Sequence, residues 1–445
     1  MSLENYSRQV REALRKAGID VLDEIRVESS GKTYRGILMP RSEGDADCIV
    51  LKREDGYNIG VRFSKETGVT LVKRHAAGIK RHEQGMKFSH KMPPISLVPV
   101  GGTIASRIDY RTGGVYGLMK AEEILANIPE LMGFVNIKRV TSPFTKMSED
   151  FDHADWQELA ETVYKELLTD SKGVVITHGT DTMHYTAAAL SFMLQNLSKP
   201  VVLVGAQKSS DRGSSDAGMN LVCAARVALS GMAEVGICMH ATLNDDYCHF
   251  IRGVKARKMD TVRRDAFRPV NDLPLANVWP DGRIEKIGVS RGRKEGKPEL
   301  RKRFEEKVAI IKAYPGSDPG VIDYYISKGF RGFVIEATAL GHVPSSISRK
   351  PWIPVIKKYT KEGIPFVVTS QCIYGRLNPN VYTNLRLLFH DAGAICGQDM
   401  TTETAYVKLG WVMGQTEELE EVKKMMLTNI AGEISERTLP ETFLY

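Results

Sequence analysis

Two glycine-containing loops place a threonine shortly after an apolar segment. The segment ISLVPV is followed by GGT at residues 101–103, and GVVIT is followed by HGTD at residues 178–181. Glycine lets the backbone approach a ligand closely, and the next residue offers a hydroxyl. A threonine hydroxyl becomes a nucleophile when a neighbouring group takes its proton. We therefore expect Thr103 and Thr180 to face one pocket.

Such a hydroxyl is a poor nucleophile at neutral pH, and a departing amine needs a proton, so the site requires a proton relay. Thr180, Asp181 and Lys258 could supply it. Because a lysine beside a carboxylate keeps its proton at neutral pH, we expect Lys258 to share protons as an ammonium rather than act as a free base. Asp181 has a second possible role, which is to pair with an α-ammonium of the substrate while main-chain N–H groups at the Gly-Thr turns polarise an amide oxygen.

Each feature also has a structural explanation. A Gly-Gly turn often joins a strand to a helix, and Thr180 or Asp181 could cap a helix N-terminus. GGT matches neither of the nucleotide-binding glycine motifs, which disfavours a nucleotide site. His178 is expected to be a structural hydrogen-bonding residue. Lys258 belongs to a basic cluster that could form a solvated or phosphate-binding face. The basic cluster comprises Lys255, Arg257, Lys258, Arg263 and Arg264.

The surrounding sequence alternates apolar strands with amphipathic helices. The strand segments ISLVPV, GVVITHG and PVVLVGA alternate with the helical patterns AEEILANIPELM, WQELAETVYKELL and TAAALSFMLQN. This alternation predicts a parallel sheet covered on both faces, in which ligands bind at the carboxyl ends of the strands. Residues 287–307 are charge-dense and mark a boundary. Beyond them VAIIKAYP, GFVIEATA and IPFVVTS predict a smaller α/β domain.

The N-terminal part has a different pattern. After a short helix, five short strand-like segments between residues 21 and 75 predict a small β-barrel. Residues 76–94 mix charge with glycine, end in two prolines and are expected to form a linker. We therefore expect three domains: an N-terminal barrel with its linker at 1–88, a large α/β domain at 89–290, and a small α/β domain at 291–445.

Composition sets limits on the function. The chain has 445 residues, with 42% hydrophobic and 26% charged side chains, as in ordinary globular proteins. No apolar stretch is long enough to span a bilayer and the first residues are polar, so we expect a cytoplasmic protein with no membrane association. The net charge of +7 is a mild excess that disfavours direct nucleic-acid binding. The six cysteines lack metal-binding spacing, so we expect reduced buried thiols, Cys372 included, and no metal site.

Taken as a pair, the two loops resemble the bacterial-type asparaginase and glutaminase family, whose signatures are GGTIA and HGTDTM. The resemblance covers residues 95–445 and implies that Thr103 attacks the amide carbon of the substrate. In that family a tyrosine in a mobile lid, thirteen residues later, orients the threonine. Tyr116 stands at that distance.

The same resemblance implies the other residues of the site. The second signature carries Thr180 and Asp181, and the lysine of the family, nine residues before a phenylalanine, corresponds to Lys258 ahead of Phe267. Substrate-binding roles fall on Ser148, Glu149, Asp181 and Ala206.

The N-terminal extension, together with VGAQKSSDRGSSDAGMNL at 204–221, TSQCIYGRLNPNVY at 369–382 and AYVKLGWVMG at 405–414, resembles the D subunit of the archaeal glutamyl-tRNA(Gln) amidotransferases. This implies an SH3-like barrel before a two-domain asparaginase-like α/β fold with parallel sheets. It also implies release of ammonia from glutamine or asparagine to a separate E subunit, which binds ATP, Mg²⁺ and tRNA. The implied assembly is a heterotetramer, in which two D chains form a homodimer through the asparaginase-like region and two E chains flank it, with no cofactor in this chain.

Two interpretations from other classes remain open on the sequence alone. The chain could be a free-standing L-asparaginase with an additional domain, or a non-catalytic RNA-binding scaffold. The complete set of threonine, tyrosine, aspartate and lysine residues argues against a decayed site. The lack of a basic and aromatic surface pattern in residues 21–75 argues against a barrel that grips RNA.

Overall fold

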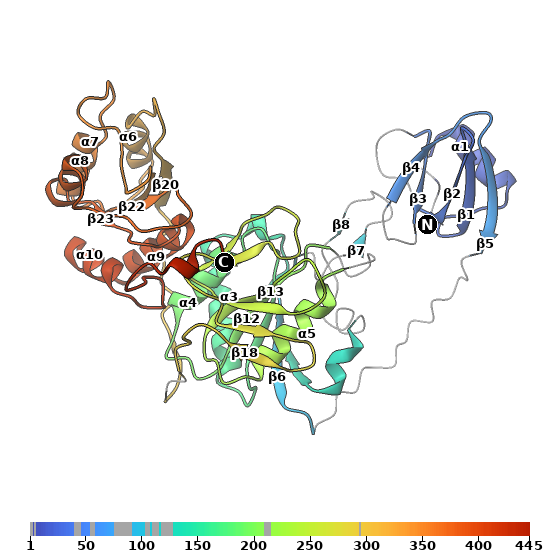
Figure 1. Ribbon diagram of the computed structural model, residues 1–445, viewed down its shortest axis with the longest axis horizontal. Coiled ribbons are helices and arrows are strands. Elements are labelled where there is room, and N and C mark those ends of the chain that lie inside the picture. Colours follow the sequence, from blue (N-terminus) through green and yellow to red (C-terminus); the bar gives the residue numbers. More distant parts are fainter. Residues whose placement is uncertain are drawn as a thin grey trace.

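The computed structural model describes residues 3, 6–39, 46–53, 58–74, 91–102, 107–108, 115–116, 128–208, 215–292 and 295–445. These residues form an N-terminal antiparallel sheet and two α/β domains, each built on its own main sheet (Figure 1). Within the described ranges, no helix is both long and apolar enough to cross a bilayer.

The N-terminal unit is a five-stranded antiparallel sheet in the order β4-β3-β2-β1-β5. Its sequence alternates, so that Ile25 and Val27 are buried between exposed neighbours, and Val10 and Leu14 of the helix complete the core. The fold class expected for this segment is confirmed as a small barrel-like sheet. Its elements are α1 (Arg8–Lys16), β1 (Glu24–Ser29), β2 (Lys32–Leu38), β3 (Cys48–Lys52), β4 (Asn58–Arg62) and β5 (Gly68–Lys73).

The large domain contains an eight-stranded sheet in the order β18-β17-β14-β13-β12-β10-β6-β9. The five strands from β13 to β9 pair in parallel, as the alternating pattern predicts, whereas the other three add an antiparallel edge. The strands are β6 (Pro94–Pro99), β9 (Asn136–Val140), β10 (Val174–Thr177), β12 (Val201–Val204), β13 (Val235–His240), β14 (Cys248–Arg252), β17 (Ala276–Val278) and β18 (Ile284–Lys286).

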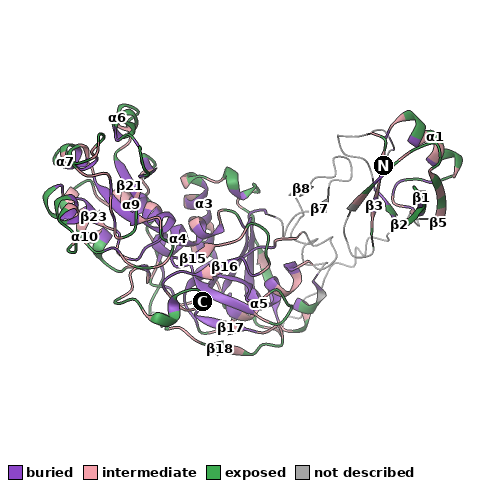
Figure 2. Cartoon of the chain, turned by 45° about the horizontal axis from the view of Figure 1, so that its top comes forward, coloured by how far each residue is buried: buried purple, intermediate pink, exposed green. Residues whose placement is uncertain are grey.

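Helices cover both faces of this sheet. Within β10, Val174 and Ile176 pack toward α3 (His153–Leu167) and α4 (Met183–Met193), whereas Val175 packs toward α5 (Ala217–Ala228) on the other face. This alternation explains why the strand is apolar throughout. Figure 2 shows the resulting buried layer in purple. The predicted helix AEEILANIPELM lies outside the described residues up to 127, and its end forms the 3-10 helix η2 (Pro129–Gly133).

The small domain is built on a parallel sheet in the order β20-β21-β22-β23. Helices α6 (Gly320–Ser327), α7 (Ile353–Lys361) and α8 (Thr383–Arg386) pack on one face, and α9 (Thr402–Gln415) and α10 (Leu419–Leu427) on the other. Helix α9 also contacts α4, so one hydrophobic core continues from the large domain into the small one. The strands are β20 (Val308–Lys312), β21 (Gly332–Ala337), β22 (Phe366–Ser370) and β23 (Ile395–Cys396).

The cysteines correct one expectation. All six are free thiols, and Cys223, Cys238 and Cys248 are buried. The expectation that Cys372 is buried is wrong, because it lies exposed in the turn after β22, where its N–H donates to Ser370 Oγ at 3.0 Å. The segments that connect buried strands mostly run over the protein surface, as this turn does.

Candidate active site

Three neighbouring strands of the large sheet end at the predicted site. Strands β6, β10 and β12 are adjacent and parallel, so the loops that follow them meet at one edge. Gly102 has a positive φ of 85°, and a Cβ atom at this residue would stand 2.3 Å from the main-chain nitrogen of Gly179. Glycine is therefore required at residue 102, because the two loops touch through their backbones.

Lys258 joins the second loop from a separate hairpin. This hairpin consists of β15 (Ala256–Lys258) and β16 (Phe267–Pro269), with Lys258 directly opposite Phe267. Lys258 Nζ donates to Thr180 Oγ1 at 2.9 Å and to Asp181 Oδ1 at 2.6 Å. Thr180 is buried, whereas the Asp181 side chain is 65% exposed, so the ion pair stands at the mouth of the site.

These residues line a cavity of about 200 Å³. Ser148, which is buried, and Glu149, which is exposed, belong to its wall through the short 3-10 helix η3 (Ser148–Asp150). The cavity thus brings Lys258 together with four other site residues that the sequence predicts, namely Ser148, Glu149, Thr180 and Asp181. Its lining residues are Gly102, Met147, Ser148, Glu149, Gly179, Thr180, Asp181, Gln207, Lys258 and Thr261.

Three further expected residues are not among the described residues that line the cavity. Thr103 lies outside the described residues, directly after Gly102 of the lining. The backbone of Tyr116 is in β8 (Val115–Tyr116), where it pairs with Arg107 of β7 (Arg107–Ile108). Ala206 is fully buried, next to the lining residue Gln207.

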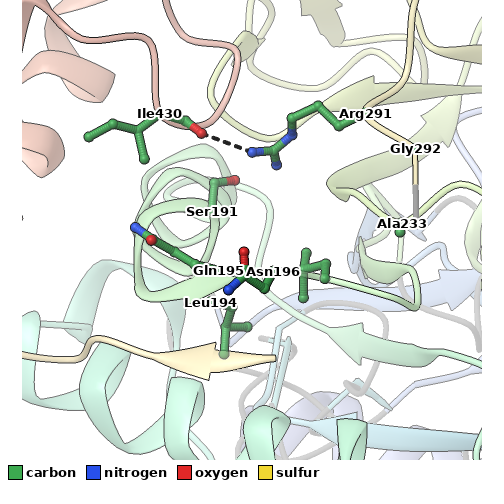
Figure 3. Close-up of a pocket in the computed structure, with 9 residues that line it drawn as sticks. Ser191, Leu194, Gln195, Asn196, Ala233, Arg291, Gly292 and Ile430 are labelled. Carbon is green, nitrogen blue, oxygen red and sulfur yellow. Dashed lines mark hydrogen bonds between the residues drawn. The ribbon is translucent and has the colours of Figure 1, made fainter. Parts of the chain in front are cut away.

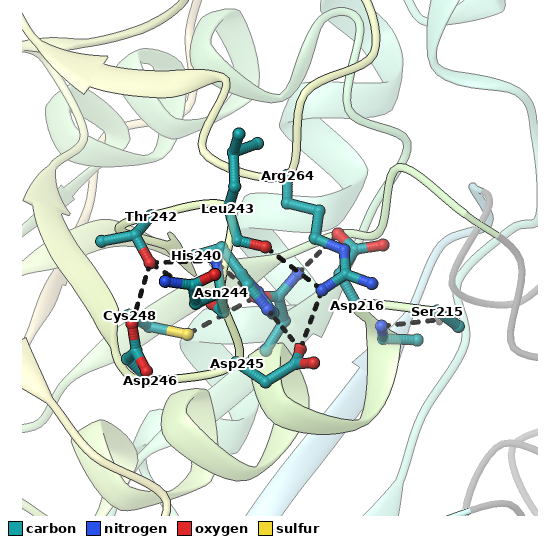
Figure 4. Close-up of polar contacts among 12 residues, drawn as sticks. Ser215, Asp216, His240, Thr242, Leu243, Asn244, Asp245, Asp246, Cys248 and Arg264 are labelled. Carbon is teal, nitrogen blue, oxygen red and sulfur yellow. Dashed lines mark hydrogen bonds and ion pairs between the residues drawn. The ribbon is translucent and has the colours of Figure 1, made fainter. Parts of the chain in front are cut away.

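The segment that carries Ala206 and Gln207 is fixed by a buried polar network. The Asp216 carboxylate accepts hydrogen bonds from the N–H groups of Gln207 and Lys208 at 3.0 Å, and from Asn220 Nδ2 at 3.0 Å. Asn220 Oδ1 lies 2.6 Å from His240 Nδ1. Figure 4 shows the outer part of this network, in which Asp216, His240 and Asp245 come from separate loops and strands. The wall after β12 is therefore held by side chains behind it.

Met147, Gln207 and Thr261 also line the cavity but are not predicted from the sequence. Gln207 follows the end of β12 at the same interval as Thr180 follows the end of β10, and this position after a third apolar strand is the signal that identifies it. Thr261 lies in the β15–β16 hairpin three residues after Lys258, where no local pattern signals a pocket.

Family models cover most of the chain. The "Asparaginase, N-terminal" model matches residues 94–288, the "Glutaminase/Asparaginase C-terminal domain" model matches 307–426, and the "GatD N-terminal domain" model matches 19–72. Among curated relatives, the D subunit of the glutamyl-tRNA(Gln) amidotransferase of Pyrococcus furiosus is 49% identical over 98% of this chain and 100% of its own length. That of Methanothermobacter thermautotrophicus is 48% identical, over 98% of each chain.

The chain belongs to the GatD family of glutamyl-tRNA(Gln) amidotransferase subunits. Solved structures agree for its two α/β domains. The thermostable L-asparaginase from Thermococcus kodakarensis matches with a TM-score of 0.69 and 29% identity, over 77% of this chain and 100% of that one. L-asparaginase I from Vibrio cholerae matches with a TM-score of 0.65 and 28% identity, over 77% and 99%. This member of the GatD family is thus an amidohydrolase subunit of the asparaginase type.

In this GatD family member, the structural explanation for Thr180 and Asp181 fails. Helix α4 begins at Met183 with Thr182 as its N-cap residue, and Thr182 Oγ1 donates to the Ser148 carbonyl at 2.6 Å. Neither Thr180 nor Asp181 is the N-cap residue. Both therefore remain available to the cavity.

His178, which precedes these residues, is fully buried. Its Nδ1 lies 2.7 Å from the Gly179 carbonyl and its Nε2 lies 2.9 Å from Thr186 Oγ1. Burial lowers the pKa of His178 to about 4, so the ring is neutral at pH 7. These contacts suit a structural residue that shapes the loop.

The basic cluster of this GatD chain does not form a free cationic face. Each of its members is within 3.1 Å of a carboxylate, which neutralises the charge that a phosphate would need. The five residues do not share one solvated face, because Lys255 is buried whereas Arg263 is exposed, and their pairing with carboxylates disfavours a phosphate site. The pairs are Lys255–Asp399, Arg257–Glu403, Lys258–Asp181, Arg263–Asp265 and Arg264–Asp245.

A second cavity of about 180 Å³ lies at the end of α4, where Figure 3 shows Arg291 above Ser191 and Gln195. Arg291 donates to the Ile430 carbonyl at 3.1 Å and pairs with the buried Glu234. None of the site residues expected from the sequence lines this cavity. In the part of the chain that the structure describes, no cluster of three or more His, Cys, Asp or Glu side chains could hold a metal ion.

Proposed function

We propose that this chain hydrolyses the side-chain amide of glutamine or asparagine through a threonine nucleophile. The ammonia is supplied to a partner subunit that converts Glu-tRNA(Gln) into Gln-tRNA(Gln). The observation that carries the proposal is the contact of Lys258 Nζ with Thr180 Oγ1 and Asp181 Oδ1, in a cavity that Gly102 also lines. The names of the relatives support the tRNA-dependent part.

The nucleophile in this proposal is Thr103, which follows Gly102 of the cavity wall. Its hydroxyl oxygen attacks the amide carbon, and main-chain N–H groups of the two glycine loops stabilise the oxyanion. The C–N bond then breaks, the proton lost by the Thr103 hydroxyl is passed through the relay to the leaving nitrogen, ammonia departs, and an ester joins Thr103 to the acyl group. Water hydrolyses this ester, which gives the carboxylate and restores the hydroxyl. Tyr116 orients Thr103 during the attack.

Lys258, Thr180 and Asp181 move the protons. An ammonium has three donors, and Lys258 directs two of them to Thr180 Oγ1 and Asp181 Oδ1. Thr180 accepts from Lys258, so its own hydroxyl proton can be donated to a neighbouring oxygen or to the departing amine. The exposed Asp181 carboxylate also binds the α-ammonium of the amino acid. Ser148, Glu149 and Ala206 hold the rest of the substrate.

The assembly in this proposal is a homodimer of this chain, joined through the asparaginase-like region, with one E chain on each side, in the cytoplasm. The E chain carries ATP, Mg²⁺ and most of the tRNA contacts. Separate subunits need coupling, because free ammonia is mostly non-nucleophilic ammonium at neutral pH. Hydrolysis of the amide is therefore useful only when the acceptor is ready. Closure of a lid that bears Tyr116 could restrict hydrolysis to that state.

The test of the nucleophile is Thr103→Ala, with Thr180→Ala as its counterpart. We expect Thr103→Ala to lower ammonia release at saturating amide by at least about a thousandfold, with an unchanged unfolding curve, because the change removes the attacking oxygen atom and little apolar volume. Retention of more than about a tenth of the rate would assign the nucleophile to Thr180 instead.

Coupling is tested by measuring ammonia release from the chain alone, with its E partner, and with the E partner, Glu-tRNA(Gln) and ATP. We expect the complete mixture to be about a hundredfold faster, as about 3 kcal/mol of preferential binding to a closed site would produce. Equal rates in all three mixtures would indicate a free-standing L-asparaginase. No ammonia in any mixture would indicate the non-catalytic scaffold.

A further inference from the structure

The small domain holds the strand that carries Lys258. Just before this strand, the Val254 carbonyl accepts a hydrogen bond from Thr404 Oγ1 at 2.9 Å, and Lys255 Nζ pairs with Asp399 Oδ2 at 2.7 Å. Within the strand, Arg257 pairs with Glu403 at 3.0 Å. Three contacts therefore connect residues 254–257 of the large domain to residues 399–404 of the small domain.

Alternation along β15 divides its side chains between two surroundings. Successive residues of a strand point to opposite faces. Arg257 reaches Glu403 of the small domain, whereas Lys258, the next residue, reaches Thr180 and Asp181 in the cavity. The pairing of Arg257 with Glu403 thus also fixes the backbone from which the Lys258 side chain projects.

The contact behind the strand is dry and reaches both arms of the hairpin. The side chains of Lys255 and Asp399 are only 1% and 2% exposed. Asn271, two residues beyond β16, donates through Nδ2 to the Asp399 carbonyl at 3.0 Å. Burial lowers the pKa of Lys255, and the neighbouring Asp399 opposes this change. Asp399 therefore holds the hairpin on both sides of the turn that leads into the cavity.

The small-domain residues of this contact lie at the N-terminus of helix α9. Thr401 is the N-cap of α9, and its Oγ1 accepts the N–H of Thr404 at 3.2 Å. Asp399, Glu403 and Thr404 lie within or just before the cap and first turn, so they keep fixed positions relative to one another. A helix end of this kind can hold a short strand more precisely than a loop could.

We propose that Asp399, Glu403 and Thr404 of the small domain are positioning residues that set the place of Lys258 Nζ against Thr180 and Asp181. The inference rests on the proposed function of Lys258 as part of the proton relay. Distances of 2.6 and 2.9 Å leave little tolerance, because a hydrogen bond is lost near 3.5 Å. A junction that served only to join the domains would change stability without changing the turnover of the folded enzyme.

Two variants test the proposal in the full chain with its partner subunit. Glu403→Gln removes the charge opposite Arg257 and keeps the size. The double variant Lys255→Met with Asp399→Leu removes the buried pair without leaving an uncompensated charge, which preserves the fold in comparable cases. For each we expect kcat for amide hydrolysis to fall about ten- to a hundredfold while KM changes less than about threefold, since small misplacements act on the chemical step.

The matched control is another fully buried lysine pair of the described residues. Lys408 and Glu433 are both 0% exposed, 2.5 Å apart, and fix the C-terminal segment rather than β15. Lys408→Met with Glu433→Leu should lower the melting temperature at least as much as the junction variant, yet leave kcat within about twofold. A control variant that loses turnover as the junction variants do would overturn the positioning role.

Two further variants separate this proposal from the proposed function. Arg257→Lys should keep more of the wild-type kcat than Arg257→Met, because the lysine preserves a charge for Glu403. Lys258→Met is measured beside them. Near-normal turnover of Lys258→Met would contradict the proposed proton relay, and with it the positioning role. Loss of turnover in Lys258→Met combined with normal turnover in the junction variants would remove the positioning role alone.

Discussion

The candidate active site and the domain junction behind it use the same pair of residue types in opposite ways. Lys258 and Asp181 at the cavity are 11% and 65% exposed, whereas Lys255 and Asp399 at the junction are 1% and 2% exposed. The two lysines stand three residues apart. The difference is solvent access: a substrate or water can compete for Asp181, but nothing can reach Asp399. Burial, rather than residue type, separates the reactive pair from the structural one.

Burial also sets the energies of the two pairs. An exposed ion pair contributes up to about 1 kcal/mol, because water screens it. Removal of one partner from a buried pair costs about 3–5 kcal/mol, since the other charge is left in the interior. The cavity pair can therefore be rearranged during a reaction at small cost, and the junction pair cannot.

The largest expected effects are a loss of activity on replacement of Lys258 and a loss of stability on replacement of Lys255. Lys258→Met should lower amide hydrolysis by about a hundred- to ten-thousandfold, the range for loss of a proton-transfer group, with less than about 1 kcal/mol of lost stability. Lys255→Met should lower the unfolding free energy by about 3–5 kcal/mol. Ammonia release and urea unfolding measure the two quantities. A Lys258→Met chain that is destabilised more than Lys255→Met would invert the comparison.

The second prediction concerns acid. Burial lowers the pKa of both His178 and His184 to about 4, and for His184 the nearby Arg257 and Lys258 lower it further. The unfolded chain, whose histidines titrate near 6.5, binds more protons between pH 6.5 and 4. Stability is therefore complete above pH 6.5 and falls as the pH drops toward 4, by roughly 3 kcal/mol for each histidine.

Urea unfolding at pH 7, 5.5 and 4.5 measures this slope. Replacement of His184 by glutamine should remove about a third of it, because burial also lowers the pKa of His178 and of His249 to about 4 and both remain in the variant. A slope that stays unchanged in His184→Gln would mean that other groups cause the acid sensitivity.

Much of the fold follows from the sequence because its signals are local. Strands of period two in residues 24–73 and apolar strands between amphipathic helices identify both sheet types. Parallel order then brings the loops after β6 and β10 together. The antiparallel edge of β14, β17 and β18 does not follow from the sequence, because these short strands carry no helix between them and are defined by their pairing alone.

The site divides in the same way. Motifs identify Thr180, Asp181 and Lys258, whereas no motif identifies the partners of the basic cluster. Lys255 pairs with Asp399 at a distance of 144 residues along the chain, and no spacing rule encodes such a pair. In the sequence the cluster is five similar cations, and only packing separates Lys258, which faces the cavity, from Lys255 and Arg257, which pair with the small domain.

The last prediction tests the exposed end of the network behind Gln207. Asp245 is 64% exposed, pairs with Arg264 at 3.1 Å and lies 3.1 Å from His240 Nε2. If solvent exposure determines how much an ion pair contributes, Asp245→Asn should lower the unfolding free energy by less than about 1 kcal/mol. It should also leave kcat and KM within about twofold of wild type. Asp216→Ala, at the buried end, should raise KM at least about tenfold, because it frees the N–H groups of Gln207 and Lys208 at the cavity wall. Steady-state kinetics of both variants measure the contrast. A tenfold rise of KM in Asp245→Asn would show that the hydrogen bonds through His240 couple the surface charge of Asp245 to the cavity. Exposure alone would then not separate reactive from structural groups in this protein.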